Sequence, residues 1–252
     1  MEEVEMGNLN LQHHLKEQHP NLHSGNLKCM IFGGLDGIIT TFAIISSCFG
    51  ASFGVKTIII LGISNVIADA LSMGLGEYIS SDLERDYVVS ELKKEDYEFD
   101  NNLEEEKDEL IQILRENENL SVEDSTSIVN TLSNYKQLFL EVMLNKELNL
   151  QMPESKKNII KGSLITFFSF LVFGLIPLLP YFVLMGTQGD GLVPRHIFII
   201  SYVCSALAVI ILGLIYIRRT KQRWIYVFKI FVIATIAAIM AYFTGWGLES
   251  AI

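Results

Sequence analysis

The sequence predicts an all-α membrane protein with five transmembrane helices and a cytosolic helical insert between the second and the third. Half of the 252 residues are hydrophobic and the mean hydropathy is +0.35, which is too apolar for a soluble globular domain. Several apolar runs reach the roughly 20 residues that a helix needs to cross a bilayer. The insert has many carboxylates and no Gly or Pro between Glu77 and Met152, a composition that favours helices.

Five apolar runs define the membrane spans and divide the chain. The predicted spans are residues 29–51, 57–80, 159–185, 196–217 and 224–246. They separate a tail (1–28), a first membrane part (29–81), the insert (82–153) and a second membrane part (154–252). In the third span, Pro177 and Pro180 predict a kink, because proline removes a backbone donor from a helix. The polar tail does not resemble a cleavable signal, so we expect the first span to act as the targeting signal.

Basic residues near the span ends predict the orientation. The loop between the fourth and fifth spans carries Arg218, Arg219, Lys221 and Arg223, and short loops rich in Lys and Arg stay in the cytosol. The tail and the insert are then cytosolic as well. The carboxyl terminus is expected to be lumenal or extracellular.

The net charge of -10 is concentrated in the insert. Residues 82–150 hold 19 of the 29 acidic residues and only seven Lys or Arg. Such a segment repels anionic lipid and nucleic acid and attracts cations, so no nucleic-acid partner is expected. Cys29, Cys48 and Cys204 lie in or beside spans without paired spacing, which predicts neither a disulfide framework nor a Cys-x-x-Cys metal site.

The insert is predicted to form three helical regions. The first continues the second span from residue 78 to 99, the second covers 103–116, and the third runs from 121 to the residue before Pro153. Ser121 followed by Asp124 resembles a capping box at the start of the third region. Its apolar residues are expected to form one packed face, made of Ile128, Leu132, Leu138 and Val142.

A polar stripe is predicted along the second span. Residues four apart lie on one side of a helix, which aligns Asn65, Asp69, Met73 and Glu77. A carboxylate at the bilayer centre costs about 2.5–3.5 kcal/mol, so Asp69 should face other protein or a wet cavity.

The first span offers a second intramembrane carboxylate, Asp36, flanked by Gly33, Gly34 and Gly37. Small residues permit close approach of another helix. Two facing carboxylates beside the Met73 thioether would suit a divalent metal or a proton path. Alternatively, the Asn and Asp side chains hydrogen-bond to neighbouring helices and Met73 is ordinary packing.

The insert carries further candidate metal ligands on shared helix faces. They are Glu91, Glu95 and Glu98 on the first region, Glu105, Glu106 and Glu109 on the second, and Met143 with Glu147 on the third. Carboxylates alone accept Mg, Ca or Mn, whereas a thioether favours softer transition ions such as Fe(II). The alternative is that these Glu residues form solvated faces.

A di-iron centre and a histidine metal site are two further possibilities. A di-iron enzyme in a helical bundle typically adds Glu-x-x-His pairs, and no His follows a Glu by three residues, so an enzyme is not expected. His13, His14, His19 and His23 could bind metal, but their irregular spacing before a span is more typical of an interfacial tail. His196 likewise begins a span.

Three segments of the sequence resemble the vacuolar iron transporter family. They are GGLDGIITTFAIISS at 33–47, ADALSMGLGEYISS at 68–81 and NYKQLFLEVMLNKELNLQMP at 134–153. The resemblance implies a homodimer that moves Fe(II), and often Mn(II), from the cytosol into a vacuole or similar acidic store in exchange for protons. No resident cofactor is expected; Co(II) and Zn(II) are further candidate ions.

The resemblance also implies the ligands. In the membrane they correspond to Asp36 and Met73, and in the insert to Glu95, Glu98, Glu106, Glu109, Met143 and Glu147. Glu91 and Glu105 are weaker candidates. Two positions depart from the family pattern: Leu144 stands where a second methionine is common, and Asn65 stands where a carboxylate is common. Because Asn cannot titrate, we hypothesise that Asp69 exchanges the proton, with Asn65 and Glu77 along the same pathway.

The implied mechanism is transfer of the ion from the insert to the membrane ligands, with release driven by protonation on the acidic side. Two functions other than antiport are also compatible with the sequence. One is a divalent-cation channel, and the other is a membrane metal sensor that does not transport; a membrane ferroxidase is less favoured.

Overall fold

The computed structural model describes residues 21–188, 193–220 and 225–251, and within them the secondary structure is helical. Five helical stretches of this described part are long and apolar enough to cross a membrane. They are Gly25–Gly50, Val55–Asn101, Lys156–Gly186, Arg195–Arg218 and Val227–Ala251. The predicted all-α class with five membrane helices is therefore confirmed.

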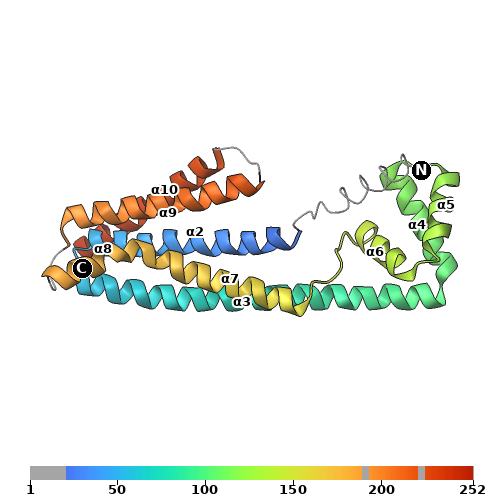
Figure 1. Ribbon diagram of the computed structural model, residues 1–252, viewed down its shortest axis with the longest axis horizontal. Coiled ribbons are helices and arrows are strands. Elements are labelled where there is room, and N and C mark those ends of the chain that lie inside the picture. The colour runs from blue at the N-terminus through green and yellow to red at the C-terminus, as the bar shows by residue number, and fades with distance from the viewer. Residues whose placement is uncertain (1–20, 189–192, 221–224, 252) are drawn as a thin grey trace, which may run out of the picture. The chain divides into compact units, whose positions relative to one another are not determined.

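The chain forms two compact units (Figure 1). One contains the residues up to Gly76 and those from Lys161 onward, which include the apolar helices. The other contains Glu77–Ile160, which is the acidic part. Helix α3, Val55–Asn101, contributes to both, because its sequence changes from apolar to acidic without any Gly or Pro after Gly76 to interrupt it.

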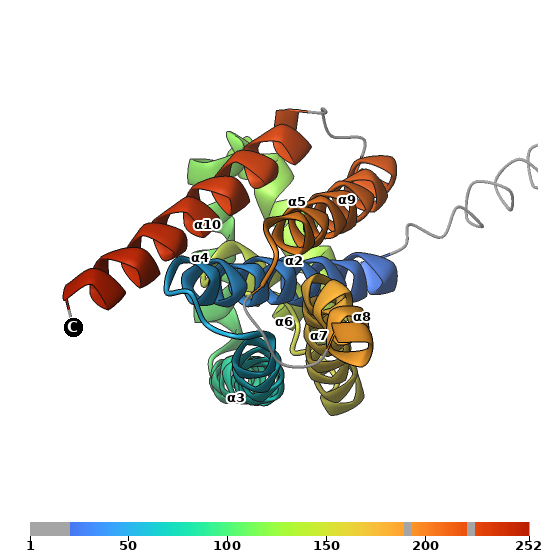
Figure 2. The same cartoon turned by 90° about the vertical axis from the view of Figure 1, so that its left-hand side faces the viewer.

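Helix α2, Asn21–Gly50, is the centre of the membrane unit (Figure 2). Two of its glycines lie against the backbone of α7, Lys156–Leu175: a Cβ on Gly33 would lie 2.5 Å from the Thr166 carbonyl oxygen, and one on Gly37 would lie 2.6 Å from that of Phe170. The expectation that the glycines around Asp36 allow close helix packing is confirmed.

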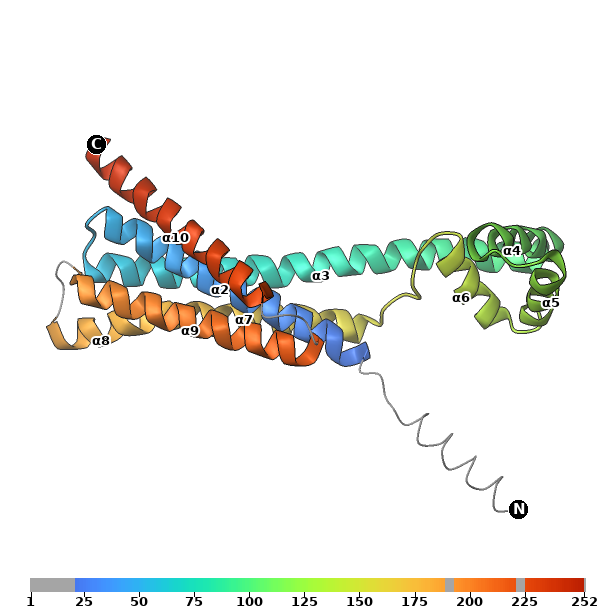
Figure 3. The same ribbon diagram turned by 90° about the horizontal axis from the view of Figure 1, so that it is seen from above.

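Helix α10, Ile225–Ala251, crosses α2 obliquely (Figures 2 and 3). The contact again uses glycine, since a Cβ on Gly245 would lie 2.1 Å from the carbonyl oxygen of Ser47. Helix α9, Arg195–Thr220, packs beside both α2 and α10. Half-buried aromatic contacts such as Phe49 on Phe198, with ring centroids 4.3 Å apart, join α2 to α9.

The third membrane stretch is interrupted, as the prolines predicted. Helix α7 ends at Leu175, a 3-10 turn η1 covers Ile176–Leu178, and α8 runs over Leu179–Gln188. Pro177 lies within the 3-10 turn, where its missing backbone donor is tolerated. Ser201 of α9 donates a hydrogen bond of 2.6 Å to the Pro177 carbonyl oxygen. This buried hydrogen bond connects the kink to α9.

In the acidic unit, α3 ends at Asn101, α4 covers Leu103–Glu118, α5 Val122–Leu132 and α6 Lys136–Lys146. The predicted third helical region is therefore two helices, separated by a turn in which the Tyr135 N–H donates to the Leu132 carbonyl oxygen at 2.8 Å. The predicted cap is confirmed, because the Asp124 N–H donates to Ser121 Oγ at 3.0 Å.

The turn also changes which residues are buried. Ile128 and Leu138, predicted to belong to a packed face, are 41% and 48% exposed. Leu132 and Val142 do contact the core of this unit, which consists of Leu110, Leu114, Val129, Phe139 and Met143. The packed-face prediction was half wrong, because it assumed one continuous helix where α6 starts in a new direction.

Candidate metal sites

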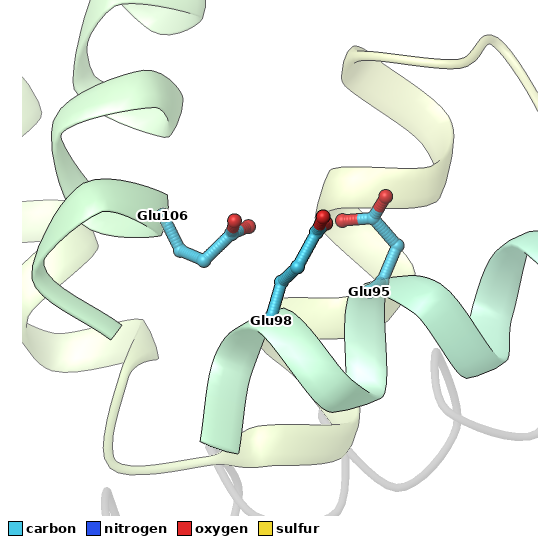
Figure 4. Close-up of side chains that lie close together, drawn as sticks. All are labelled: Glu95, Glu98 and Glu106. Carbon is cyan, nitrogen blue, oxygen red and sulfur yellow. The ribbon is translucent and has the colours of Figure 1, made fainter. Parts of the chain in front are cut away.

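Three carboxylates of the acidic unit converge at the junction of α3 and α4 (Figure 4). Glu95 and Glu98 lie one turn apart near the end of α3, and Glu106 lies in the first turn of α4. One oxygen from each side chain lies within 4.8 Å of the other two. The single residue Asn102 joins the two helices, so the chain reverses directly beside the cluster. This geometry brings together three of the predicted ligands.

The cluster is buried in a way that is costly for carboxylates. Glu95 and Glu106 are only 5% and 6% exposed, and Glu95 Oε2 is buried without a hydrogen-bond partner within the described part of the chain. Burial, followed by repulsion from Glu147 and Glu106, raises the pKa of Glu95 to about 7. Burial and then repulsion from Glu98 raise the pKa of Glu106 to about 7. A divalent cation would relieve both costs.

Glu109 and Glu147 surround this cluster. Both side chains are exposed, and both repel the charges of Glu95 and Glu106. Partial loss of solvent around Glu147, followed by repulsion from Glu109 and Glu98, raises the pKa of this carboxyl as well. All five predicted carboxylate ligands of the insert thus belong to one electrostatically coupled group.

Met143 lies in a different environment. It is fully buried and belongs to the apolar core with Leu110 and Phe139. Leu110 follows Glu106 by one helical turn on α4, so this core lies beside the carboxylate cluster. Leu144, the residue at the second methionine position, is also fully buried. The role of the Met143 thioether as a ligand stays a prediction.

The two weaker candidates do not join the cluster: Glu91 pairs with a lysine, and Glu105 is exposed to solvent. Glu91 accepts from Lys94 Nζ at 2.7 Å in an i,i+3 ion pair, yet it still repels Glu147. Glu105 is exposed and repels Glu106. Both residues add negative potential around the cluster rather than joining the three converging side chains.

The membrane unit holds the second set of predicted residues. Asn65 Nδ2 donates to Asp69 Oδ2 at 2.5 Å, one helical turn along α3. Asp36 of α2 lies within electrostatic range of Asp69, so the two carboxylates come from facing helices. Both are half-buried, as is Met73. On α3, Asn65, Asp69 and Met73 lie between the buried row, Val66 and Ala70, and the exposed apolar row, which includes Ile67 and Leu71.

The other predicted residues lie outside these two groups. Glu77 is half-buried in the acidic unit. His13, His14 and His19 lie outside the described residues, as do Lys221 and Arg223, and His23 is described only as part of the backbone of α2. His196 is exposed at the start of α9. Sequence reasoning missed Asp82, whose Oδ1 is buried without a hydrogen-bond partner in the described part.

Comparison with known proteins decides the family. Residues 27–246 match the sequence model of the VIT family. The chain belongs to this family. It is 38% identical over 198 residues to the vacuolar iron transporter of Toxoplasma gondii. The aligned residues make up 79% of this chain and 66% of that protein, so the chain spans just under two thirds of this relative. It is 40% identical over 204 residues to the vacuolar iron transporter of Plasmodium falciparum, or 81% of this chain and 74% of that one.

More distant VIT relatives extend the match to plants. Vacuolar iron transporter 1 of Tulipa gesneriana is 30% identical over 212 residues, which is 83% of this chain and 82% of that protein. The relatives are named as transporters rather than enzymes, in agreement with the missing Glu-x-x-His pairs. The resemblance carried by the three motifs is therefore confirmed. Both the membrane residues and the acidic cluster lie within the region that matches the VIT family.

Proposed function

We propose that this VIT-family protein transports Fe(II) from the cytosol into a vacuole or another acidic store, in exchange for protons. The observation that carries the proposal is the convergence of Glu95, Glu98 and Glu106, with their oxygens within 4.8 Å of one another. The names of the relatives supply the substrate and the compartment. Mn(II), Co(II) and Zn(II) are proposed as further substrates, because oxygen-rich sites discriminate weakly among these ions.

The insert is proposed to collect the ion. Three buried or converging carboxylates and the surrounding Glu109 and Glu147 create a strongly negative site on the cytosolic side. One oxygen of Glu95 has no hydrogen-bond partner within the described residues, which suits a cation ligand. The adjacent Met143 would add a soft donor for Fe(II) if its side chain turns toward the cluster.

Within the membrane, the ion would pass to Asp36 and Met73. Asp36 and Asp69 come from facing helices, and bringing two carboxylates together in a membrane is unfavourable unless a cation or protons accompany them. We propose that Asp69 carries the exchanged proton. The Asn65 amide donates to it and so orients one oxygen, while Glu77 continues the same helical stripe.

Proton exchange follows from competition for the same oxygens. A carboxylate binds either a metal ion or a proton, so an acidic lumen weakens the hold on the metal and favours its release. We further propose a homodimer, as the family resemblance implied, embedded in lipid with the insert and the amino-terminal tail in the cytosol. No resident cofactor is needed for this cycle.

Uptake of Fe(II) by proteoliposomes of purified protein tests the proposal. We expect accumulation when the lumen is acidic, and its loss when an ionophore collapses the pH gradient. Parallel measurements with Mn(II), Co(II) and Zn(II) give the substrate range. Uptake that persists with the ionophore would indicate a channel instead, and binding without uptake would indicate a sensor.

The variant Asp69→Asn isolates the proton step. We expect it to retain Fe(II) binding at the insert but to lose proton-coupled uptake, because an amide side chain does not titrate and so cannot exchange a proton. The matched control is Ser72→Ala, an exposed position on the same helix. Unchanged coupled uptake by Asp69→Asn would remove Asp69 from the mechanism.

A further inference from the structure

A lysine in the acidic unit contacts three side chains of another helix. Lys136 is the first residue of α6, and its Nζ lies 2.8 Å from Asp96 Oδ1 and 2.6 Å from Asp100 Oδ1. The same ammonium lies 5.4 Å from the centroid of the Phe99 ring. All three partners lie in the last two turns of α3. Lys136 therefore joins the start of α6 to the end of α3.

The position of this lysine is unfavourable for its own helix. The amino-terminal end of a helix carries partial positive charge, so a lysine in the first turn is repelled by it. Tyr135, the preceding residue, provides no side-chain cap. Contacts to Asp96 and Asp100 offset this local cost, which indicates that Lys136 acts through tertiary structure rather than through the stability of α6.

An aromatic contact continues the same interface. Phe99 packs edge-on against Phe139 of α6, with ring centroids 5.1 Å apart and planes at 64°. Lys136, Phe139 and Met143 follow one another at spacings of three and four residues and so share a face of α6. Glu147 comes one turn after Met143. The interface thus determines where α6 presents its two predicted ligands.

The α3 side of the interface is equally close to the metal cluster. Asp96 directly follows Glu95, and Phe99 directly follows Glu98. One short segment of α3 therefore uses one face for the cluster and the adjacent face for Lys136. Glu147 directly follows α6 and Glu95 lies on α3, so any shift of α6 along α3 would move these two carboxylates relative to each other.

We propose that Lys136 is a positioning residue for the metal site of the insert, which holds α6 against α3 so that Glu147 and Met143 lie beside Glu95 and Glu98. This inference rests on the proposed function, because it assumes that the cluster binds a transition ion. Residues outside the ligand shell that orient ligands typically change metal affinity by about 10–100-fold when they are removed.

The sign of the effect separates positioning from simple electrostatics. Removing a positive charge beside an acidic cluster should strengthen cation binding if the charge acts only through space. Loss of positioning should weaken it. Lys136→Met removes the charge and keeps most of the side-chain volume, whereas Lys136→Arg keeps a cation that can bridge two carboxylates.

A matched control is available in the same unit. Lys107 forms an ion pair of 2.7 Å with Glu104, three residues earlier on the same helix α4. Lys107→Met therefore removes the same charge near the cluster without disconnecting two helices. We expect it to leave the Kd for Mn(II) unchanged or slightly lower. Glu106→Gln serves as the reference in which the insert site itself is disabled.

The experiment is a titration of the full-length purified protein in lipid nanodiscs with Mn(II), with free Mn(II) followed by electron paramagnetic resonance. The component of binding lost in Glu106→Gln belongs to the insert. For this component we expect Lys136→Met to raise the Kd by about tenfold or more. Lys136→Arg should restore it to near the wild-type value, and far-ultraviolet circular dichroism should show unchanged helix content in all variants.

Each outcome decides the inference. If the wild-type protein binds no Mn(II) that depends on Glu106, the metal site of the proposed function fails and the inference fails with it. If the wild type binds but Lys136→Met binds as tightly or more tightly, the inference alone is overturned. A folded Lys136→Arg protein that is as weak as Lys136→Met also overturns it, because another cation should maintain the contact.

Discussion

Glu95 and Glu106 are the residues that most distinguish the acidic unit from an ordinary solvated helix pair. Both side chains are almost fully buried, and neither forms an ion pair within the described residues. Burying an unpaired carboxylate is unfavourable, and the side chain responds by holding its proton at higher pH. Such an arrangement is retained more readily for binding than for stability. We therefore expect these carboxylates to raise the affinity for metal and to lower the stability of the metal-free protein.

Neutralising one buried carboxylate tests both of these effects. We expect Glu95→Gln to weaken Mn(II) binding at the insert by about tenfold or more, because a ligand is lost. The same change should leave the unfolding temperature of the metal-free protein unchanged or higher at neutral pH, since an unpaired buried charge is removed. The measurements are a Mn(II) titration and heat-induced unfolding.

Glu141→Gln is the matched control for this variant. Glu141 lies exposed on α6 and is not among the converging carboxylates. Its neutralisation removes the same charge from the same unit. Equal loss of affinity in both variants would mean that only the net charge of the insert matters, which contradicts a built site.

The pH dependence follows from the raised pKa values. Glu95 and Glu106 each have a pKa of about 7 in the folded protein and 4.5 as the ordinary value. The folded state therefore binds more protons than the unfolded state between these values, and the stability of the metal-free protein falls as pH rises through this window. Unfolding temperatures measured in steps across the window should decline and then level off above about pH 7.

Metal affinity should change in the opposite direction over the same window. Below about pH 7, the affinity for the ion should rise about tenfold per pH unit for each proton that the ion displaces. We expect the Kd for Mn(II) at the insert to fall with rising pH and to become constant above the shared pKa. An affinity that is constant across the window would show that neither buried carboxylate is a ligand.

At the scale of helices, close packing depends on glycines at a few positions. Gly33 and Gly37 of α2 lie against the backbone of α7, and Gly74 of α3 lies against Phe167 of α7. These contacts hold Asp36 and Asp69 on adjacent elements. Backbone proximity of this kind cannot be compensated by moving a side chain. The membrane site therefore depends on residues that contribute no side chain to it.

Gly37→Ala tests the α2–α7 contact. A Cβ at this position would lie 2.6 Å from the backbone oxygen of Phe170, so the helices must separate. We expect destabilisation of about 1–3 kcal/mol, with loss of Fe(II) uptake because Asp36 is displaced. The control is Gly76→Ala, where a Cβ would meet nothing within 4 Å. That change should be neutral or stabilising, since alanine favours a helix by about 1 kcal/mol over glycine.

The helices of the acidic unit show where local patterns are insufficient. The cap at Ser121 was predictable, because a side-chain oxygen three residues before a backbone N–H is a local interaction. The break between α5 and α6 was missed, because no Gly or Pro marks it and only Ser133 and Asn134, which favour turns, signal it. Packing of Phe139 and Met143 into the core decides the direction of α6, and that packing is a tertiary effect.

At the scale of the whole molecule, charge is segregated along the chain. The acidic unit faces water and the membrane unit exposes apolar rows such as Ile67 and Leu71, each 49% exposed, which suits lipid. The basic loop after α9 predicts that the acidic unit lies in the cytosol. The acidic unit would then bind Fe(II) on the cytosolic side of the membrane, from which the ion enters the vacuole.

Single-cysteine labelling tests this orientation. In a background without the three native cysteines, Asp124→Cys marks the acidic unit and Thr57→Cys marks the other end of α3, and both positions are exposed. On sealed vacuoles we expect a membrane-impermeant maleimide to label Asp124→Cys directly and Thr57→Cys only after permeabilisation. The reverse pattern would invert the predicted topology.

The sequence by itself determined the helical class, the five membrane stretches and the identity of the carboxylates, because hydropathy and helical spacing are local properties that survive any arrangement of the helices. Only the tertiary structure decided that Glu95, Glu98 and Glu106 converge while Glu91 pairs with Lys94, and that Met143 lies in an apolar core. Lys136 contacts Asp100, which lies 36 positions earlier in the chain, a separation that no helical period can reveal. Burial and convergence depend on how helices pack, and packing joins residues that the sequence keeps apart.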